Sequence, residues 1–338
     1  MYDLKIGVAG AGSWGRHLVR NYHHLGVLHA CCDVDKKVLE SVRKTYGTQK
    51  ITSDFEAIVS DPEIDGVVIS APAVEHYKLA KMSLEAGKAT YVEKPMALKE
   101  SHCRELVELS KEKKAILMVG HLMLYHPALR QIKEYIDSGK LGNVYYAYSQ
   151  RVNLGTVRKD ENSLWSFAPH DISMLLYLLG SEVKDVSARG QYYLQKGLED
   201  VVFLSLYFKD NKMAQIQISW LDPHKERKLT IVGSKQMLVF DDIQSVEKIK
   251  IYDKGIDKRE REKSGFDSYG DYLTLRAGDI YLPRVDMSEP LRLECMHFLD
   301  CIRDKRQPLT DGQNGLDVVK ILEKAQESLA NNGVPVSL

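Results

Sequence analysis

Two side chains able to exchange a proton stand next to prolines in this sequence. Lys94 lies within Glu93-Lys94-Pro95, and His170 directly follows Pro169. A positioned lysine or neutral histidine can accept or donate a proton at a substrate hydroxyl. Proline restricts the backbone of the residue before it, which limits where Lys94 can point. Position alone leaves another interpretation open for each residue: Lys94 as a surface lysine, and His170 as a histidine that packs near a helix cap.

A glycine-rich element lies at the start of the chain. Gly10, Gly12 and Gly15 form a GxGxxG pattern that follows an apolar run and opens an expected helix, with Ser13 and Trp14 inside the turn. Glycines in this place allow backbone to approach a pyrophosphate, which the helix N-terminus attracts. Asp33, 21 residues beyond Gly12, is placed to accept hydrogen bonds from ribose hydroxyls. An acid there repels a 2′-phosphate, so the pattern favours NAD over NADP.

Further polar residues come where later strands are expected to end. Ser70-Ala71-Pro72 closes an apolar run, and His76 follows one turn into the next helix. Strand ends in a parallel sheet face the cofactor, so Ser70, Pro72 and His76 could line the nicotinamide side together with Glu93 and Lys94. The alternative is a turn proline followed by a solvated histidine.

The elements that would position these groups alternate in the first third of the chain. A continuous apolar run such as Gly66–Ser70 indicates a strand buried on both faces. This βα order predicts a doubly wound parallel sheet within residues 1–121. The expected strands are Leu4–Ala9, Val27–Cys32, Gly66–Ser70, Thr90–Val92 and Ala115–Val119, and the expected helices are Trp14–His24, Lys36–Tyr46, Val74–Ala86 and Lys99–Lys113.

Residues 122–338 show a different pattern, with several runs that alternate every second residue. Consecutive runs of this kind, with turn residues such as Asp210-Asn211, predict a large open, mostly antiparallel sheet in an α+β domain. We expect a helix to begin at Pro169, a surface loop over Asp253–Asp271, and C-terminal helices that pack back on the first domain. The strands are Val144–Val152, Val183–Leu194, Val201–Lys209, Lys212–Trp220, Lys228–Val232 and Gln236–Phe240, and the helices Pro127–Asp137, Pro169–Leu179, Leu291–Arg303 and Leu316–Leu329.

Composition narrows the class of protein. The 338 residues carry 47 Lys+Arg and 47 Asp+Glu, so the chain has no general attraction for nucleic acid or an anionic membrane. No apolar run approaches the roughly 18 residues of a membrane span, and no signal peptide is visible. Five cysteines, an odd number without metal-ligand spacing, indicate a reduced cytoplasmic protein with no structural metal.

Taken together, these motifs resemble the Gfo/Idh/MocA family of NAD(P)-dependent sugar oxidoreductases. The resemblance rests on the glycine element, Pro72 with His76, Glu93-Lys94-Pro95, Val119-Gly120-His121 and a helix-opening His170, in this order. It implies hydride transfer at a sugar or cyclitol carbon, with Lys94 and His170 as the catalytic pair. Many members carry an acid four residues before the histidine, where this chain has Ser166.

Within the family, the chain resembles enzymes that act on nucleotide sugars. The segments that carry this likeness are Arg151–Gly155, Leu164–Ser173 and Gly278–Pro283. They are similar to UDP-N-acetylglucosamine 3-dehydrogenases, which implies NAD-dependent oxidation of the C3 hydroxyl for lipid A, lipopolysaccharide or surface-glycan synthesis. Arginines suit a diphosphate. The residues expected to contact substrate are Lys94, Tyr125, Arg151, Asn153, Arg158, Trp165 and His170.

Three alternatives remain open at this stage. One is oxidation of the related glucuronate, UDP-N-acetylglucosaminuronate, and another is oxidation of inositol or a free sugar. The third is a catalytically silent NAD-binding regulator, which Ser166 keeps open. Residues of Val201–Phe208 alternate between two apolar faces, so we expect helices on one face and a second subunit on the other, in a homodimer or homotetramer.

Overall fold

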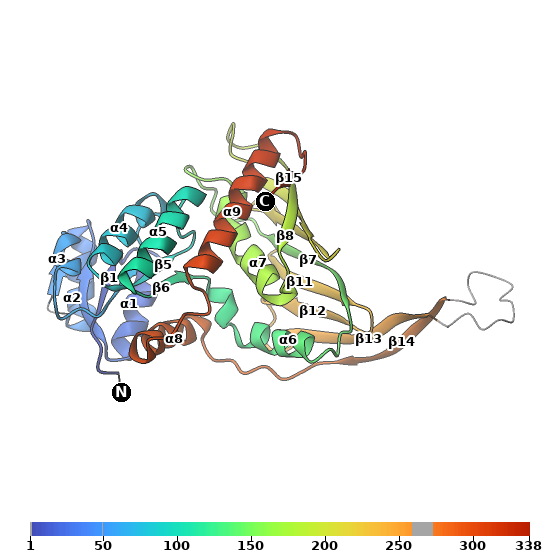
Figure 1. The fold of residues 1–338 in the computed structure, drawn as a ribbon, viewed down its shortest axis with the longest axis horizontal. Helices are drawn as coiled ribbons and strands as arrows, with labels where there is room; N and C mark the ends of the chain where they lie inside the picture. The colour runs from blue at the N-terminus through green and yellow to red at the C-terminus, as the bar shows by residue number, and fades with distance from the viewer. Residues whose placement is uncertain (1, 49, 259–272) are drawn as a thin grey trace, which may run out of the picture. The chain divides into compact units, whose positions relative to one another are not determined.

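The computed structural model describes residues 2–48, 50–258 and 273–338, which form two compact units (Figure 1). The first unit contains residues Met1–His126 and Ser288–Glu323. The second contains Pro127–Met287 and Lys324–Leu338. The last long helix therefore begins in the first unit and ends in the second.

The first unit is built on a six-stranded parallel sheet with the order β3-β2-β1-β4-β5-β6. The strand order reverses between β1 and β4, and in such sheets ligands bind at the carboxyl ends of the strands at this point. This confirms the doubly wound parallel sheet. Its strands are β1 (Ile6–Ala9), β2 (Leu28–Cys32), β3 (Lys50–Thr52), β4 (Gly66–Ile69), β5 (Ala89–Glu93) and β6 (Leu117–Gly120).

Helices cover both faces of this sheet (Figure 1). Buried side chains of α1, α2 and α8 pack with Val8, Val68 and Tyr91 in one core on one face, while α4 and α5 lie on the other. The cap of α2 shows the local signals at work: Asp35 accepts from the Lys37 amide, and Gly47 ends the helix at positive φ. The helices are α1 (Gly15–His24), α2 (Lys36–Tyr46), α3 (Glu56–Val59), α4 (Ala73–Glu85), α5 (Glu100–Lys113), the 3₁₀ turn η1 (Leu122–Tyr125), α8 (Pro290–Asp304) and α9 (Gly312–Ala330).

The second unit is a nine-stranded sheet with the order β14-β13-β12-β11-β7-β10-β9-β8-β15. Among these neighbours β7 and β10 are parallel and the other pairs antiparallel, which confirms the predicted open, mostly antiparallel sheet. Helix α7 packs on β7, β9 and β10, and α6 packs on α7. The elements are α6 (Pro127–Asp137), β7 (Val144–Val152), α7 (Ser163–Leu179), β8 (Val183–Gln191), β9 (Val201–Phe208), β10 (Met213–Ser219), β11 (Glu226–Gly233), β12 (Met237–Asp241), β13 (Ile249–Lys258), β14 (Leu273–Tyr281) and β15 (Val336–Ser337).

Two expectations about this unit are wrong. Helix α7 begins at Ser163 rather than at Pro169, because Asn162 caps it by accepting from the Trp165 amide. Pro169 therefore lies inside the helix, where its missing amide removes one internal hydrogen bond. Part of the predicted surface loop is a strand, since β13 extends to Lys258 and pairs with β14. The rest of that loop, 259–271, lies outside the described residues.

Candidate functional site

The strand ends of the first unit form one row of polar and glycine positions. Strand register aligns Cys32, Ala9, Ile69, Val92 and Val119 across the sheet, so the residues that follow them are neighbours in turn. Those next residues are Asp33, Gly10, Ser70, Glu93 and Gly120. The row contains four of the residues expected at a cofactor site, brought together by pairing between segments far apart in the sequence.

The glycine turn packs against the row with almost no space to spare. A Cβ on Gly10, whose φ is +87°, would lie 2.7 Å from backbone atoms of Ser70 and Ala71. A Cβ on Gly15 would lie 2.0 Å from the Gly10 carbonyl oxygen. The Ser70 hydroxyl donates to the Gly10 carbonyl at 2.6 Å and fixes the turn to β4. These two glycines are therefore required by the fold of the turn itself.

Gly12 differs, because a Cβ there would meet no protein atom within 4 Å. Its side-chain position opens into free space just before the N-terminus of α1, where a pyrophosphate would need backbone to approach. Asp33 lies against the same turn: its Oδ2 accepts from the Ala11 amide at 2.7 Å, and its Oδ1 from the Asp35 amide at 2.9 Å. Each oxygen keeps a further lone pair for a ribose hydroxyl. The residues present thus fit a dinucleotide.

Lys94 follows Glu93 at the carboxyl edge and is half-buried. The Glu93 carboxylate accepts from the Trp14 indole at 2.6 Å, which connects the glycine turn to the strand that carries Lys94. Burial raises the pKa of Glu93, while the Trp14 hydrogen bond and the Lys94 charge lower it. The structure therefore places Lys94 within the electrostatic reach of Glu93 and next to the proposed cofactor turn.

His76 has a different role from the one expected. Its side chain is 2% exposed, with Nδ1 2.7 Å from the Pro95 carbonyl oxygen and Nε2 2.8 Å from that of Ala71. Both nitrogens are occupied, so the ring joins the end of β4 to the loop after Lys94 and does not present a free nitrogen to a ligand. Burial lowers the pKa of His76. Pro72 is the residue that precedes α4 in this same region.

His121 is part of the Val119-Gly120-His121 motif, to which the sequence analysis assigned no role. The structure places this histidine beside Lys94. It follows Gly120, which pairs with Glu93. Its Nδ1 lies 2.6 Å from Oδ1 of Asn314, so the neutral ring donates there and leaves Nε2 as an acceptor. Burial, with a contribution from the Lys94 charge, lowers the pKa of His121 to about 4. The strand-end position after β6 was the signal that could have identified it.

His170 lies on α7 of the second unit, about two turns after the helix begins. The expectation that it lies near a helix N-terminus is therefore wrong, and the helix dipole gives no reason for a neutral ring there. The side chain is half-buried. The next residue, Asp171, is turned away to Arg151 on β7, whose Nε is 2.5 Å from its Oδ2. Asp171 thus balances a buried arginine.

Of the other residues expected to contact substrate, some are buried and the rest are at least partly exposed. Tyr125 is fully buried and its hydroxyl bonds to Thr310 at 2.9 Å, so the expected sugar contact is wrong. Arg151 is 7% exposed, and the pair with Asp171 occupies part of its guanidinium. Arg158 is exposed, while Asn153, which directly follows β7, and Trp165, in the first turn of α7, are half-buried. Ser166 is buried within α7, and Asn162 rather than Ser166 caps the helix.

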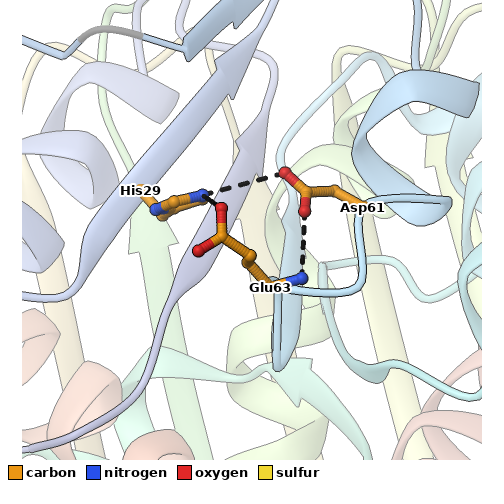
Figure 2. A group of neighbouring side chains, drawn as sticks. All are labelled: His29, Asp61 and Glu63. Carbon is orange, nitrogen blue, oxygen red and sulfur yellow. Dashed lines mark hydrogen bonds and ion pairs between the residues drawn. The ribbon is translucent and has the colours of Figure 1, made fainter.

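In the described part of the chain, His29, Asp61 and Glu63 form the one group with ligand atoms close enough for a metal ion (Figure 2). The His29 Nε2 lies 3.7 Å from Asp61 and 3.6 Å from Glu63. Lys50 bonds to both carboxylates, at 2.9 and 2.6 Å, and Lys5 bonds to Glu63. These lysines hold the pKa of Glu63 at about 2. The group is an ion-pair cluster that two ammonium ions already neutralise.

Comparison with protein families supports the features just described. Residues 4–121 match the model described as an oxidoreductase family with an NAD-binding Rossmann fold. Residues 129–239 match the Gfo/Idh/MocA C-terminal domain. The chain belongs to the Gfo/Idh/MocA oxidoreductase family. It is an NAD-binding enzyme, and no helix among its described residues is long and apolar enough to cross a membrane.

Several members of this family match the chain over nearly its whole length. A scyllo-inositol 2-dehydrogenase (NAD(+)) from Bacillus subtilis is 24% identical, and the match covers 100% of this chain and 97% of that protein. The solved UDP-N-acetylglucosamine 3-dehydrogenase GnnA from Acidithiobacillus ferrooxidans is 21% identical, with a TM-score of 0.81 and coverage of 97% and 98%. A levoglucosan dehydrogenase solved with NADH and L-sorbose is 19% identical, with a TM-score of 0.83 and coverage of 100% and 99%. The solved structures support the shared fold.

Proposed function

We propose that this Gfo/Idh/MocA oxidoreductase oxidises a secondary ring hydroxyl of a UDP-linked amino sugar, namely the C3 hydroxyl of UDP-N-acetylglucosamine. The observation that carries the chemistry is the position of Lys94, which follows β5 beside the glycine turn and is linked to it through Glu93 and Trp14. The nucleotide-sugar substrate is supported by the segments Arg151–Gly155 and Leu164–Ser173, and by the fold shared with GnnA.

The cofactor assignment follows the row of strand ends. Gly12 and the N-terminus of α1 would hold the pyrophosphate, since the open position at Gly12 admits it. Asp33 would accept from the adenosine ribose, and Ser70 and Pro72 would border the nicotinamide end. Bound NAD accepts the hydride from the substrate carbon.

The protein's own groups handle the proton of the reacting hydroxyl. Lys94 hydrogen-bonds the substrate oxygen, and His170 accepts its proton; the two roles can be exchanged between them. His121, buried and held neutral by its bond to Asn314, lies next to Lys94 and supports that part of the site from below the surface. Asn153, Arg158 and Trp165 are the remaining candidates for contacts to the sugar and diphosphate.

A cyclitol is the second candidate substrate, and one observation favours it. Arg151 is buried and paired with Asp171, which reduces the cationic surface available for a diphosphate. An inositol has no diphosphate to bind. One relative that matches the chain over its whole length is a scyllo-inositol 2-dehydrogenase, whose name specifies NAD.

Two further assignments belong to this proposal. We place the enzyme in the cytoplasm, where its five cysteines, all buried and unpaired, remain reduced. We also propose a homo-oligomer formed through the face of the large sheet opposite α7. That face carries Tyr146, Tyr148, Phe203, Tyr207 and Met213, each 40–45% exposed.

The experiment measures NADH formation with UDP-N-acetylglucosamine, its glucuronate analogue, myo-inositol and free N-acetylglucosamine in parallel. Because the equilibrium can oppose ketone formation, a transaminase trap or mass spectrometry follows the product. Activity confined to UDP-N-acetylglucosamine and lost in Lys94→Ala supports the proposal. Activity on inositol alone would show that the substrate is a cyclitol and not a nucleotide sugar. NAD binding without any turnover would support the alternative of a catalytically silent regulator.

A further inference from the structure

Glu93, a member of the row of strand-end residues in the first unit, is connected to two further buried polar groups, Tyr91 and Glu294. Tyr91 and Glu294 are 0% exposed and Glu93 is 8% exposed. The Tyr91 hydroxyl oxygen is 3.0 Å from Oε1 of Glu93 and 3.1 Å from Oε2 of Glu294. One tyrosine on β5 therefore bridges a carboxyl group at the site to a carboxyl group on α8.

The number of hydrogens in this bridge limits its charge state. A tyrosine hydroxyl has one hydrogen, so it can donate to only one of the two carboxyl groups. If both carboxyl groups were ionised, the one that receives no hydrogen from Tyr91 would face a lone pair of the tyrosine oxygen at hydrogen-bonding distance. Two buried negative charges would then lie on either side of the same hydroxyl group. Both contacts become hydrogen bonds when one carboxyl group is protonated and donates to the tyrosine oxygen. The geometry thus requires one proton shared by the pair.

The surroundings of the two carboxyl groups decide where that proton resides. Glu93 accepts from the Trp14 indole at 2.6 Å and from the Lys94 amide at 3.2 Å, and donors of this kind stabilise a carboxylate. Glu294 has the Tyr91 contact, and its Oε1 is buried without a hydrogen-bond partner. An unpartnered carboxyl oxygen costs far less free energy on a neutral acid than on an anion. Burial and the Glu93 charge raise the pKa of Glu294 well above its ordinary value.

We infer that Glu294 is protonated at neutral pH and donates a hydrogen bond to the Tyr91 hydroxyl oxygen. The Tyr91 hydroxyl in turn donates a hydrogen bond to an ionised Glu93. Glu294 is then a positioning residue: it acts through Tyr91 on the carboxylate that anchors Trp14 of the glycine turn and the Lys94 backbone. The inference concerns the cofactor end of the site and holds whichever substrate the enzyme oxidises.

The lack of a side chain at Gly120 is an independent observation that fits this chain of hydrogen bonds. A Cβ at that position would lie 2.6 Å from the Tyr91 hydroxyl oxygen and 3.0 Å from the Glu93 carboxyl carbon. The space is thus reserved for the bridge. The other titratable groups within electrostatic reach of the bridge are Tyr22 on α1, Cys295 on α8 and Tyr125 in η1, which burial keeps uncharged, and the positively charged Lys94.

Infrared spectroscopy of the whole enzyme at pH 7.5 tests the proton directly, because a protonated carboxyl group has a carbonyl band separate from that of a carboxylate. We expect such a band in the wild type and in the control Glu108→Gln, which changes an exposed residue of α5. Glu294→Gln should remove the band, and Glu93→Gln should retain it. Tyr91→Phe should retain the band but shift its frequency, because the donated hydrogen loses its acceptor. Absence of the band in the wild type, or its loss in Glu93→Gln alone, overturns the inference.

The indole N–H signal of Trp14, assigned with Trp14→Phe among the three tryptophans, gives a second readout by NMR. As pH rises through the pKa of Glu294, a second buried charge next to Tyr91 should move this signal in the wild type and in Glu108→Gln. The signal should stay constant over the same range in Glu294→Gln. An identical titration in Glu294→Gln and wild type would show that Glu294 does not carry the proton. Neither readout depends on turnover, so failure here is distinct from failure of the proposed activity.

Discussion

Arg151 and Asp171 form a buried ion pair in the second unit, with Nε and Oδ2 2.5 Å apart and both side chains at most 8% exposed. The pair joins β7 to α7 at the position next to His170. Each partner neutralises the other, because a charge at this depth without a counterion is expensive. The arrangement orients the turn of α7 that carries the proposed base.

Removing one partner of this pair should destabilise the enzyme strongly. We expect Asp171→Asn to lower the free energy of unfolding by ~3–5 kcal/mol, because Arg151 stays charged and buried. The double variant Arg151→Met with Asp171→Leu should recover most of that loss, since it leaves no unpaired charge. Urea denaturation monitored by circular dichroism measures both. A loss under about 1 kcal/mol in Asp171→Asn, the range of exposed pairs, would show that the pair is solvated.

Lys94 should matter for turnover far more than for cofactor binding. Lys94→Ala is expected to reduce kcat by about 10²–10⁴-fold, the usual contribution of a group that assists proton transfer. NAD affinity should change little, because the turn at Gly12 and Asp33 is untouched. Lys99→Ala, an exposed lysine that precedes α5, is the matched control. Steady-state kinetics and calorimetric titration separate the two effects, and equal loss in both lysine variants contradicts the assignment.

Most of the first unit was predictable from sequence because its signals are local, although strand β3 and helix α3 were not among the expected elements. Gly66–Ile69 is a continuous apolar run, and the GxGxxG turn has its shape imposed by Gly10 and Gly15. The start of α7 was missed because Pro169 is favoured in a first helical turn, whereas Asn162 is the real cap. Leu164, Ala168 and Ile172, all buried at helical spacing, were the contrary signal.

The buried side chains around Lys94 could not be predicted in the same way. Glu294 lies 203 positions from Tyr91, and Asn314 lies 193 positions from His121, so their contacts depend on the folding of α8 and α9 onto the sheet. No local pattern specifies such a pair. The strand β13 was missed because the charged stretch from Asp253 onward is typical of loops, although Ile251–Lys258 pairs with β14.

Substitutions at Gly12 and at the outer glycine Gly15 should have different effects on stability and on NAD binding. Gly12→Val places its Cβ where no protein atom lies within 4 Å, so we expect an unchanged melting temperature. The new side chain occupies the space of the pyrophosphate, and NAD affinity should fall by more than ~10-fold, or about 1.4 kcal/mol.

Gly15→Ala is the matched comparison, because its Cβ would lie 2.0 Å from the Gly10 carbonyl oxygen. This variant should lower the melting temperature as well as NAD affinity. Differential scanning fluorimetry with and without NAD distinguishes the two variants. Full NAD affinity in Gly12→Val would remove the turn from the cofactor site.

His121 should make the fold sensitive to mild acid. Its pKa is about 4 in the folded chain against 6.5 for the unperturbed side chain. As pH falls from about 6.5 toward 4, the unfolded chain binds a proton that the folded chain does not, so stability decreases. The full difference corresponds to ~3 kcal/mol at 1.36 kcal/mol per pKa unit. Urea midpoints at several pH values should show a smaller acid loss in His121→Gln than in the wild type, and equal losses would assign the effect to other groups.

The open face of the large sheet offers a final prediction about assembly. Register places Tyr146, Met213 and Tyr207 in one row across β7, β10 and β9, and Phe203 and Tyr148 lie on the same face. Five partly exposed, largely apolar side chains on one face of a sheet are typical of a subunit interface. The double variant Tyr148→Glu with Phe203→Glu should convert the oligomer to monomers, because association would bury unpaired charges.

Light scattering coupled to size exclusion reports the mass of each variant. Val246→Glu, a 78% exposed residue between β12 and β13, controls for the added negative charge and should leave the mass unchanged. A wild-type chain that is already monomeric would show that this face stays open to solvent. An oligomer that persists in the double variant would place the contact on another surface, because two carboxylates at the centre of an apolar interface cannot be buried without a counterion.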